Sequence, residues 1–241
     1  TKRFPSWTLG LAGILLLILV PVLYYLPRAQ AKNDPASHIP EKPVHVDHSD
    51  IVKGEFKTGQ DVTRACLECH EDAATQVMGT SHWTWESKAY DLPWRDEPVT
   101  IGKINQINNF CIGTQGNENK CMSCHAGYGW EEGRETQQAN PENVDCLACH
   151  ADPGAYGKGT YGNPADGIDL LAAARSVRTP SRENCGKCHF DGGGGNGVKH
   201  GDLDESLYFP SENYDVHMGG ENNMQCVDCH WTEDHQILGR M

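Results

Sequence analysis

The chain has 241 residues, enough for one large domain or two small ones. Only 38% of them are hydrophobic and the mean hydropathy is −0.58, which is poor for an enzyme domain built on a single side-chain core. Residues 1–32 hold four of the 20 Lys and Arg and no acidic residue, so the remainder carries a net charge of −17. That charge excludes a nucleic-acid binder, which needs a basic surface to neutralise phosphates.

The N-terminal part predicts a transmembrane anchor. Residues 7–26 form a run of 20 residues with no ionisable side chain before Tyr24, and a helix of that length spans the hydrocarbon layer of a membrane, roughly 30 Å. Trp7 and Tyr24 fit the two interfaces. Lys2 and Arg3 precede the run, which favours a cytoplasmic N-terminus and an exported remainder.

A cleaved signal peptide is the alternative interpretation, because Ala29-Gln30-Ala31 offers a small-x-small cleavage site. The apolar run is longer than the usual apolar region of a signal peptide, which favours the retained anchor. We therefore expect a cytoplasmic tip and anchor helix over residues 1–26, an extended Pro-rich linker over 27–47, and a second domain over 48–241.

The second domain contains the sequence Cys-x-x-Cys-His five times. This pattern is typical of c-type haem attachment, in which two thiols form thioethers and the adjacent histidine binds iron as the proximal ligand. Paired CxxC motifs also occur in zinc sites and redox dithiols, but neither explains a histidine after every second cysteine. The predicted thioether residues are Cys66, Cys69, Cys121, Cys124, Cys146, Cys149, Cys185, Cys188, Cys226 and Cys229, and the proximal ligands are His70, His125, His150, His189 and His230.

Five covalent haem c groups would supply the apolar core that the side chains lack. They also predict an extracytoplasmic location, since bacteria attach haem c outside the cytoplasm. We expect a mainly α-helical and irregular multihaem fold with little sheet. A helix is expected over about 61–78, carrying the first motif.

Seven histidines remain as possible distal ligands, namely His38, His45, His48, His82, His200, His217 and His235. Five haems need at most five, so every iron can be bis-histidine. His38 and His45 lie in the linker and are the weakest of the seven. The methionines Met78, Met122, Met218, Met224 and Met241 form a secondary pool whose ligation would raise the potential. The glycine-rich run before His200 could allow close approach to a haem, form a surface loop, or bind a cation weakly.

From about residue 48 onward the sequence resembles the octahaem tetrathionate reductase family of multihaem cytochromes. The matching stretches are DHSD, FKTGQDVTRACLECH, SHWTWES, NNFCIG, CMSCHAGYGW, NVDCLACH, RENCGKCHF, GGGGNGVKHGDLD, DVHM and CVDCHWTEDHQILGR. The resemblance implies close-packed haems. It also implies that the histidines in the matched stretches are the distal ligands: His48, His82, His200, His217 and His235.

The chain departs from that family in two respects. Members carry eight haems, whereas this chain has five motifs, and members are usually soluble, whereas this chain has a predicted membrane anchor. In the family the second haem is the reaction site, with a distal lysine and a nearby Cys and Asn. Cys111 and Asn108 resemble that Cys and Asn. The lysine is not identified, with Lys120, Lys158 and Lys199 as possibilities. Cys111, the eleventh cysteine, could equally be a small buried residue.

Two functions follow from these features. The first is electron transfer by a membrane-anchored periplasmic cytochrome of the bacterial inner membrane, between a quinone-interacting or iron–sulfur membrane subunit and a soluble periplasmic redox partner. The anchor has no ionisable residue at its centre to bind quinone, so a partner subunit is implied. The second is reduction of a sulfur or nitrogen oxyanion at the second haem. A filament-forming role is a third possibility, which the anchor disfavours.

Overall fold

The computed structural model describes residues 6–33, 44–108, 111–192 and 195–238. Four sequence-based expectations fall outside them: the tip before Ser6, the linker histidine His38, the glycines 193–194 and Met241. The chain divides into two compact units, Thr1–Val44 and His45–Met241, which are described separately.

The first unit contains the helix α1 (Ser6–Asn33). It continues seven residues beyond Leu26, where the anchor was expected to end, because Ala29, Gln30 and Ala31 are good helix formers. Large apolar side chains along it are exposed, including Leu16 and Leu17. Within the described part of the chain, no helix combines the length and apolar character required to cross a membrane.

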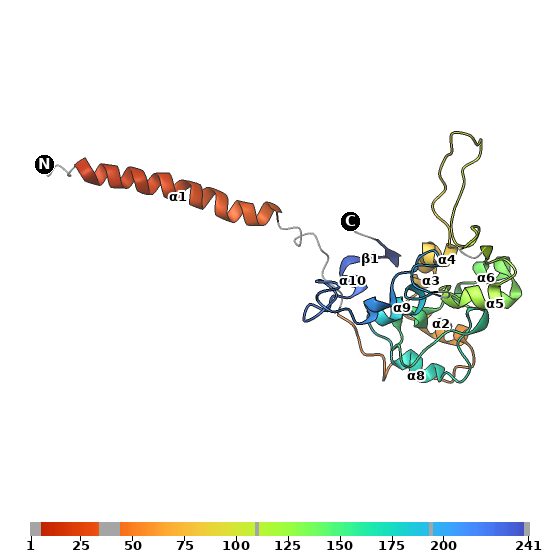
Figure 1. The fold of residues 1–241 in the computed structure, drawn as a ribbon. Helices are drawn as coiled ribbons and strands as arrows, with labels where there is room; N and C mark the ends of the chain where they lie inside the picture. The colour runs from red at the N-terminus through yellow and green to blue at the C-terminus, as the bar shows by residue number, and fades with distance from the viewer. Residues whose placement is uncertain (1–5, 34–43, 109–110, 193–194, 239–241) are drawn as a thin grey trace. The chain divides into compact units, whose positions relative to one another are not determined.

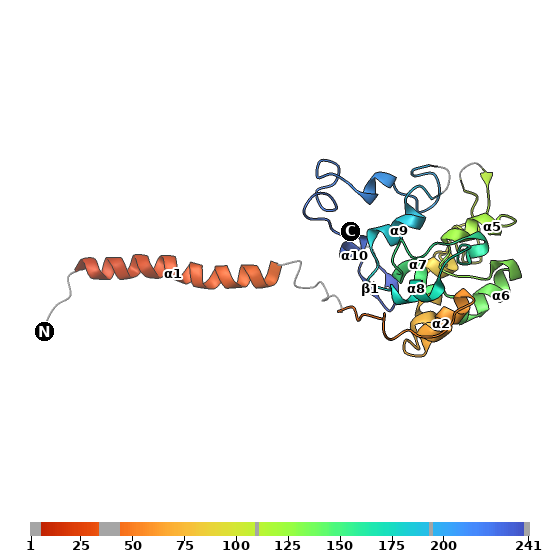
Figure 2. The same cartoon turned by 90° about the horizontal axis from the view of Figure 1, so that it is seen from below.

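The second unit is a set of short helices joined by irregular segments (Figures 1 and 2). The α-helices are α2 (Gly59–Leu67), α3 (Ala73–Met78), α4 (Ser81–Thr84), α5 (Glu118–Cys121), α6 (Arg134–Ala139), α7 (Cys146–His150), α8 (Leu170–Arg175), α9 (Arg182–His189) and α10 (Cys226–Cys229). The 3-10 helices are η3 (Met122–Cys124), η4 (Trp130–Glu132), η5 (Pro141–Asn143), η6 (Thr160–Gly162) and η7 (Glu205–Tyr208). The expected mainly helical and irregular fold with little sheet is confirmed.

The single helix expected over 61–78 is wrong: the chain forms α2 and α3 with a break between them. Thr58 caps α2 by accepting from the backbone of Asp61, whose carboxylate accepts from Thr58 in return. The helix ends at Leu67, inside the first motif, and α3 begins only at Ala73. His70 therefore lies in the break, where its ring is exposed.

Two small groups of apolar side chains form the core. The larger joins α2, α7 and α8 through Val62, Leu147, Leu170 and Ala173. The smaller contains Ala74, Trp83 and Val144. Both lie beside CxxCH motifs, since Cys66 packs against the larger group and Cys146 against the smaller one.

The only sheet in the described residues is a hairpin of β1 (Thr232–Glu233) and β2 (Gln236–Ile237), paired antiparallel. Its turn residues Asp234 and His235 both have positive φ, 47° and 60°, as a type I′ turn requires. A long segment between α4 and α5, drawn in yellow, projects from the helices (Figure 1). Its two limbs are held by paired backbone hydrogen bonds between Tyr90 and Val99.

Candidate functional site

The five motifs hold ten of the eleven cysteines. None of the eleven cysteines, all of which the structure describes, forms a disulfide. Helices α7, α9 and α10 each begin at or near a motif and are capped by the residue before them, as Asp145 caps α7 by accepting from Ala148. The local sequence thus fixes where each pair of sulfurs lies.

Sulfurs of different motifs lie beside each other. The side chains of Cys66 and Cys146 lie close enough to interact, and this interaction lowers the pKa of Cys66 and raises that of Cys146. Cys124 and Cys188 are neighbours in the same sense, as are Cys185 and Cys226. The first motif therefore adjoins the third, the second adjoins the fourth, and the fourth adjoins the fifth.

Two predicted distal histidines stand opposite proximal ones. The ring centroids of His48 and His70 are 6.2 Å apart, with an angle of 31° between the ring planes. Those of His82 and His189 are 6.1 Å apart, with an angle of 77°. An imidazole nitrogen binds a first-row metal at about 2 Å, so two rings on opposite sides of one metal have centroids roughly 6 Å apart. Both pairs have that spacing.

The tautomers of four histidines fit iron binding through Nε2. The Nδ1–H of His48 donates to the Val46 carbonyl at 2.6 Å, that of His150 to Arg178 at 3.1 Å, and that of His189 to Gly201 at 2.7 Å. His235 donates in the same way to Oε1 of Gln76 at 2.7 Å. Such a bond to one ring nitrogen orients the other for a metal.

The second motif is different. Nε2 of His125 donates to the Trp83 carbonyl at 2.6 Å, while its buried Nδ1 has no partner among the described residues. Three tryptophans surround the ring, with Trp130 nearest at 4.9 Å between centroids. Burial lowers the pKa of His125 to about 3, which keeps the ring neutral. A buried nitrogen without a hydrogen-bond partner is unfavourable, so Nδ1 marks a place where a further group would bind. Nε2 is already bonded to the Trp83 carbonyl, so the ring would have to flip before Nε2 could bind iron.

Burial also keeps other predicted ligands neutral, the form that binds metal. It lowers the pKa of His82, His150 and His235. The side chains of His200 and His217 are exposed. His45, which the sequence made a weak possibility, lies with its ring centroid 5.5 Å from that of His48.

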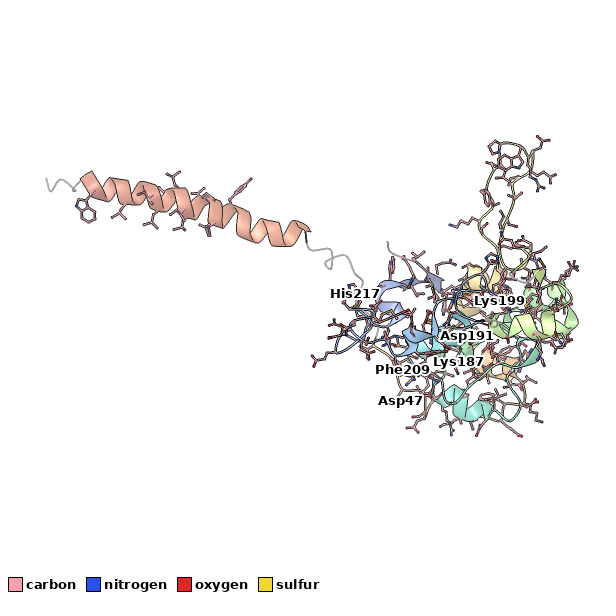
Figure 3. The ribbon with its side chains drawn as sticks, viewed as in Figure 1. Asp47, Lys187, Asp191, Lys199, Phe209 and His217 are labelled. Atoms are coloured by element: carbon pink, nitrogen blue, oxygen red, sulfur yellow. The ribbon has the colours of Figure 1, made fainter. Side chains whose placement is uncertain are left out.

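A cavity of about 240 Å³ lies at the second motif. Both cysteines of the motif, Cys121 and Cys124, line it together with Asn108. The buried Oδ1 of Asn108 has no hydrogen-bond partner in the described part of the chain. Three lysines also line it: Lys103, Lys120 and Lys199. Lys199 is labelled in Figure 3, well apart from His217.

The structure shows which lysines lie at the second motif. Lys158 is not available, because its Nζ is paired with Asp145 at 2.5 Å and donates to the Gly127 carbonyl at 3.2 Å. Lys120 and Lys199 are at the cavity, and Lys103 joins them although no sequence pattern marked it. Asn108 lines the cavity, whereas Cys111 is exposed and is not among the lining residues.

Comparisons with known proteins agree with this site. Residues 108–190, which include the second, third and fourth motifs, match the family model of cytochrome c7 and related cytochrome c. The structure is similar to the crystal structure of octahaem cytochrome c from Shewanella oneidensis, with a TM-score of 0.70 and 48% sequence identity over 81% of this chain. This chain spans 43% of that one. It is also 24% identical to an uncharacterized protein of Archaeoglobus fulgidus, over 80% of each chain.

Proposed function

This chain is a multihaem c-type cytochrome related to the octahaem cytochrome c of Shewanella oneidensis, and we propose that it transfers electrons between a membrane respiratory partner and a soluble periplasmic partner. The observation that carries the proposal is the spacing of His48 with His70 and of His82 with His189. Two imidazoles on one iron leave no position for substrate, so such a site carries electrons only. Haem c, when bound, supplies a one-electron iron couple at each motif.

We propose five haem c groups, one for each CxxCH motif. His48 is the distal ligand at the first motif and His82 at the fourth. We assign His235 to the same part of the domain as the first and third motifs. His70 helps to lower the pKa of His235, and His235 helps to lower that of His150. The neighbouring sulfurs support two groups of adjacent haems. The first and third motifs form one group. The second, fourth and fifth motifs form the other, in which the fourth has neighbours on both sides.

The membrane location is part of the proposal. The apolar sequence of residues 7–26, the absence of acidic residues before residue 33, and Lys2 and Arg3 ahead of that run support attachment to the bacterial inner membrane with the haem domain in the periplasm. A chain in which a cleavable signal peptide replaces residues 1–44 should then move from the membrane fraction to the soluble periplasmic fraction with its haem content unchanged. Recovery of the full chain in the soluble fraction would contradict the anchor.

The electron-transfer proposal is tested by EPR of the oxidised protein and carbon monoxide binding to the reduced protein. His48→Ala should convert one low-spin haem into a haem that binds carbon monoxide. His45→Ala is the matched control, since His45 is an exposed histidine three residues away, and it should leave every haem low-spin. A change with His45→Ala and none with His48→Ala would overturn the ligand assignment.

A second candidate function is reduction of a sulfur or nitrogen oxyanion at the second motif. The cavity supports it, because three lysines beside Cys121 and Cys124 provide local positive charge in an otherwise acidic protein. The resemblance to octahaem tetrathionate reductases points to the same motif. In this function Lys199 or Lys120 contacts the substrate or the iron, and Asn108 donates or accepts a hydrogen bond at the cavity wall.

The second function predicts that the reduced wild-type protein, or a Lys199→Met variant, binds carbon monoxide at one haem. Turnover should then be measured with tetrathionate, sulfite, nitrite and hydroxylamine. Lys88→Met is the control, because Lys88 is exposed on the projecting segment and is absent from the cavity lining. A wild-type protein and the Lys199→Met and Lys120→Met variants that all fail to bind carbon monoxide would exclude catalysis at the second motif.

A further inference from the structure

The side chain of Arg182 is buried between the fourth and fifth motifs. It is 4% exposed and lies at the start of α9, three residues before Cys185. Its backbone N–H donates to Oε1 of Gln225, the residue before Cys226, at 2.8 Å. Since Cys185 and Cys226 are themselves neighbours, Arg182 lies where the two motifs meet.

The guanidinium binds neutral oxygens. Nη2 donates to the carbonyls of Met218 and Met224, at 2.9 and 2.6 Å, and to Oδ1 of Asn223 at 3.1 Å. Nη1 donates to the carbonyl of Tyr208 at 3.3 Å. The buried Nε has no partner among the described residues. Arg182 therefore holds the segment between η7 and the fifth motif in place through these hydrogen bonds.

No carboxylate in the described part of the chain lies within ion-pair distance of Arg182. Asp215 is near enough for Arg182 to help lower its pKa, but that carboxylate accepts from the backbone N–H groups of His217 and Met218. A buried arginine is usually paired, because burial of an unpaired charge is unfavourable. Its charge is also permanent, since a guanidinium is not deprotonated in proteins. The protein thus maintains a fixed positive charge at this junction.

We propose that Arg182 raises the reduction potentials of the fourth and fifth haems, and so makes this end of the series the preferred site for electrons. Reduction adds one negative charge to a haem, and a nearby cation in a medium of low dielectric constant stabilises the reduced form. Carbonyl dipoles hold the guanidinium in place without cancelling its net charge. This inference rests on the proposed electron-transfer function and adds a residue that sets its direction.

The test is a spectroscopic redox titration of the full chain at pH 6. Arg182→Gln removes the charge and keeps hydrogen-bonding groups, whereas Arg182→Lys keeps the charge. We expect Arg182→Gln to lower the midpoint potential of one or two haems by at least 59 mV, which corresponds to a tenfold change in the one-electron reduction equilibrium. In Arg182→Lys, the decrease in midpoint potential should be less than half of the decrease seen in Arg182→Gln. Arg175→Gln, which removes an exposed charge from α8, should shift no haem.

Haem content by mass spectrometry and the low-spin spectrum serve as checks on folding. They also separate the two proposals, because a wild-type protein that lacks five reducible haems contradicts the proposed function whatever the variants do. With five haems present in each protein, unchanged potentials in Arg182→Gln would overturn the role of Arg182. So would an equal decrease in Arg182→Lys and Arg182→Gln, which would assign the effect to packing rather than charge.

Discussion

The rings of His82 and His189 are nearly perpendicular, at 77°, whereas those of His48 and His70 are inclined by only 31°. The distances between centroids are almost the same in the two pairs. The relative orientation of two axial imidazoles controls how the iron d orbitals split, so the two sites should be spectroscopically distinct even though their ligands are chemically identical.

We therefore predict two different low-spin EPR signals. Perpendicular rings at the fourth motif should give a highly anisotropic signal, and the more parallel rings at the first should give an ordinary rhombic one. His82→Ala should abolish only the highly anisotropic signal. The assignment fails if His82→Ala removes the rhombic signal and leaves the anisotropic one intact.

The buried ion pair of Lys158 and Asp145 should be important for stability. The two side chains are 8% and 0% exposed, so Lys158→Met leaves a buried carboxylate without its cation. Loss of one partner from a buried pair reduces the free energy of unfolding by about 3–5 kcal/mol. Denaturant unfolding measures this change.

The control for that prediction is Arg134→Gln, which breaks the more exposed pair with Glu86 and should cost about 0–1 kcal/mol. Equal effects of the two substitutions would show that the Lys158–Asp145 pair contributes no more than a surface pair.

Stability should also decline in alkaline solution. Burial raises the pKa of Tyr128 and Tyr156, whose hydroxyls donate to Asp145 at 2.8 and 2.9 Å. In the unfolded chain tyrosine ionises near pH 10. The stabilising contribution is therefore complete below about pH 10 and is lost as the pH rises above it, because ionisation then favours the unfolded chain.

Unfolding free energies between pH 8 and 11 measure this effect. Tyr156→Phe removes one ionisable hydroxyl and should reduce the slope above pH 10. If the variant and the wild type lose stability with the same slope, ionisation of this tyrosine is not responsible.

Gly59 at the start of α2 should not tolerate a methyl group. A Cβ at this position would lie 2.5 Å from two ring carbons of Tyr128, which is fully buried. Gly59→Ala should lower the free energy of unfolding by about 1–3 kcal/mol, the range for overpacking a core. Gly113→Ala is the matched substitution, because no atom lies within 4 Å of its added Cβ. Thermal unfolding of the two variants should differ clearly, and a Gly59→Ala protein as stable as Gly113→Ala would contradict the packing argument.

The sequence alone determined the chemical class of this protein. Five CxxCH motifs predict thioether residues and proximal histidines by adjacency, and adjacency is visible without a fold. The shortage of apolar residues predicted an interior completed by cofactors, and the apolar side chains form only small groups around Val62 and Trp83. The helix expected over 61–78 failed because local periodicity does not register the break around His70.

Only the tertiary structure decided which distant residues meet. His82 faces His189 across 107 positions of sequence, and Cys66 adjoins Cys146, because short helices and irregular segments bring them together. Lys199 joins Asn108 at the cavity, while Lys158 is withdrawn by Asp145. Arg182 carried no sequence signal at all, since an arginine beside a motif is ordinarily a solvated charge. Long-range packing determines its burial, and burial determines what its charge can do.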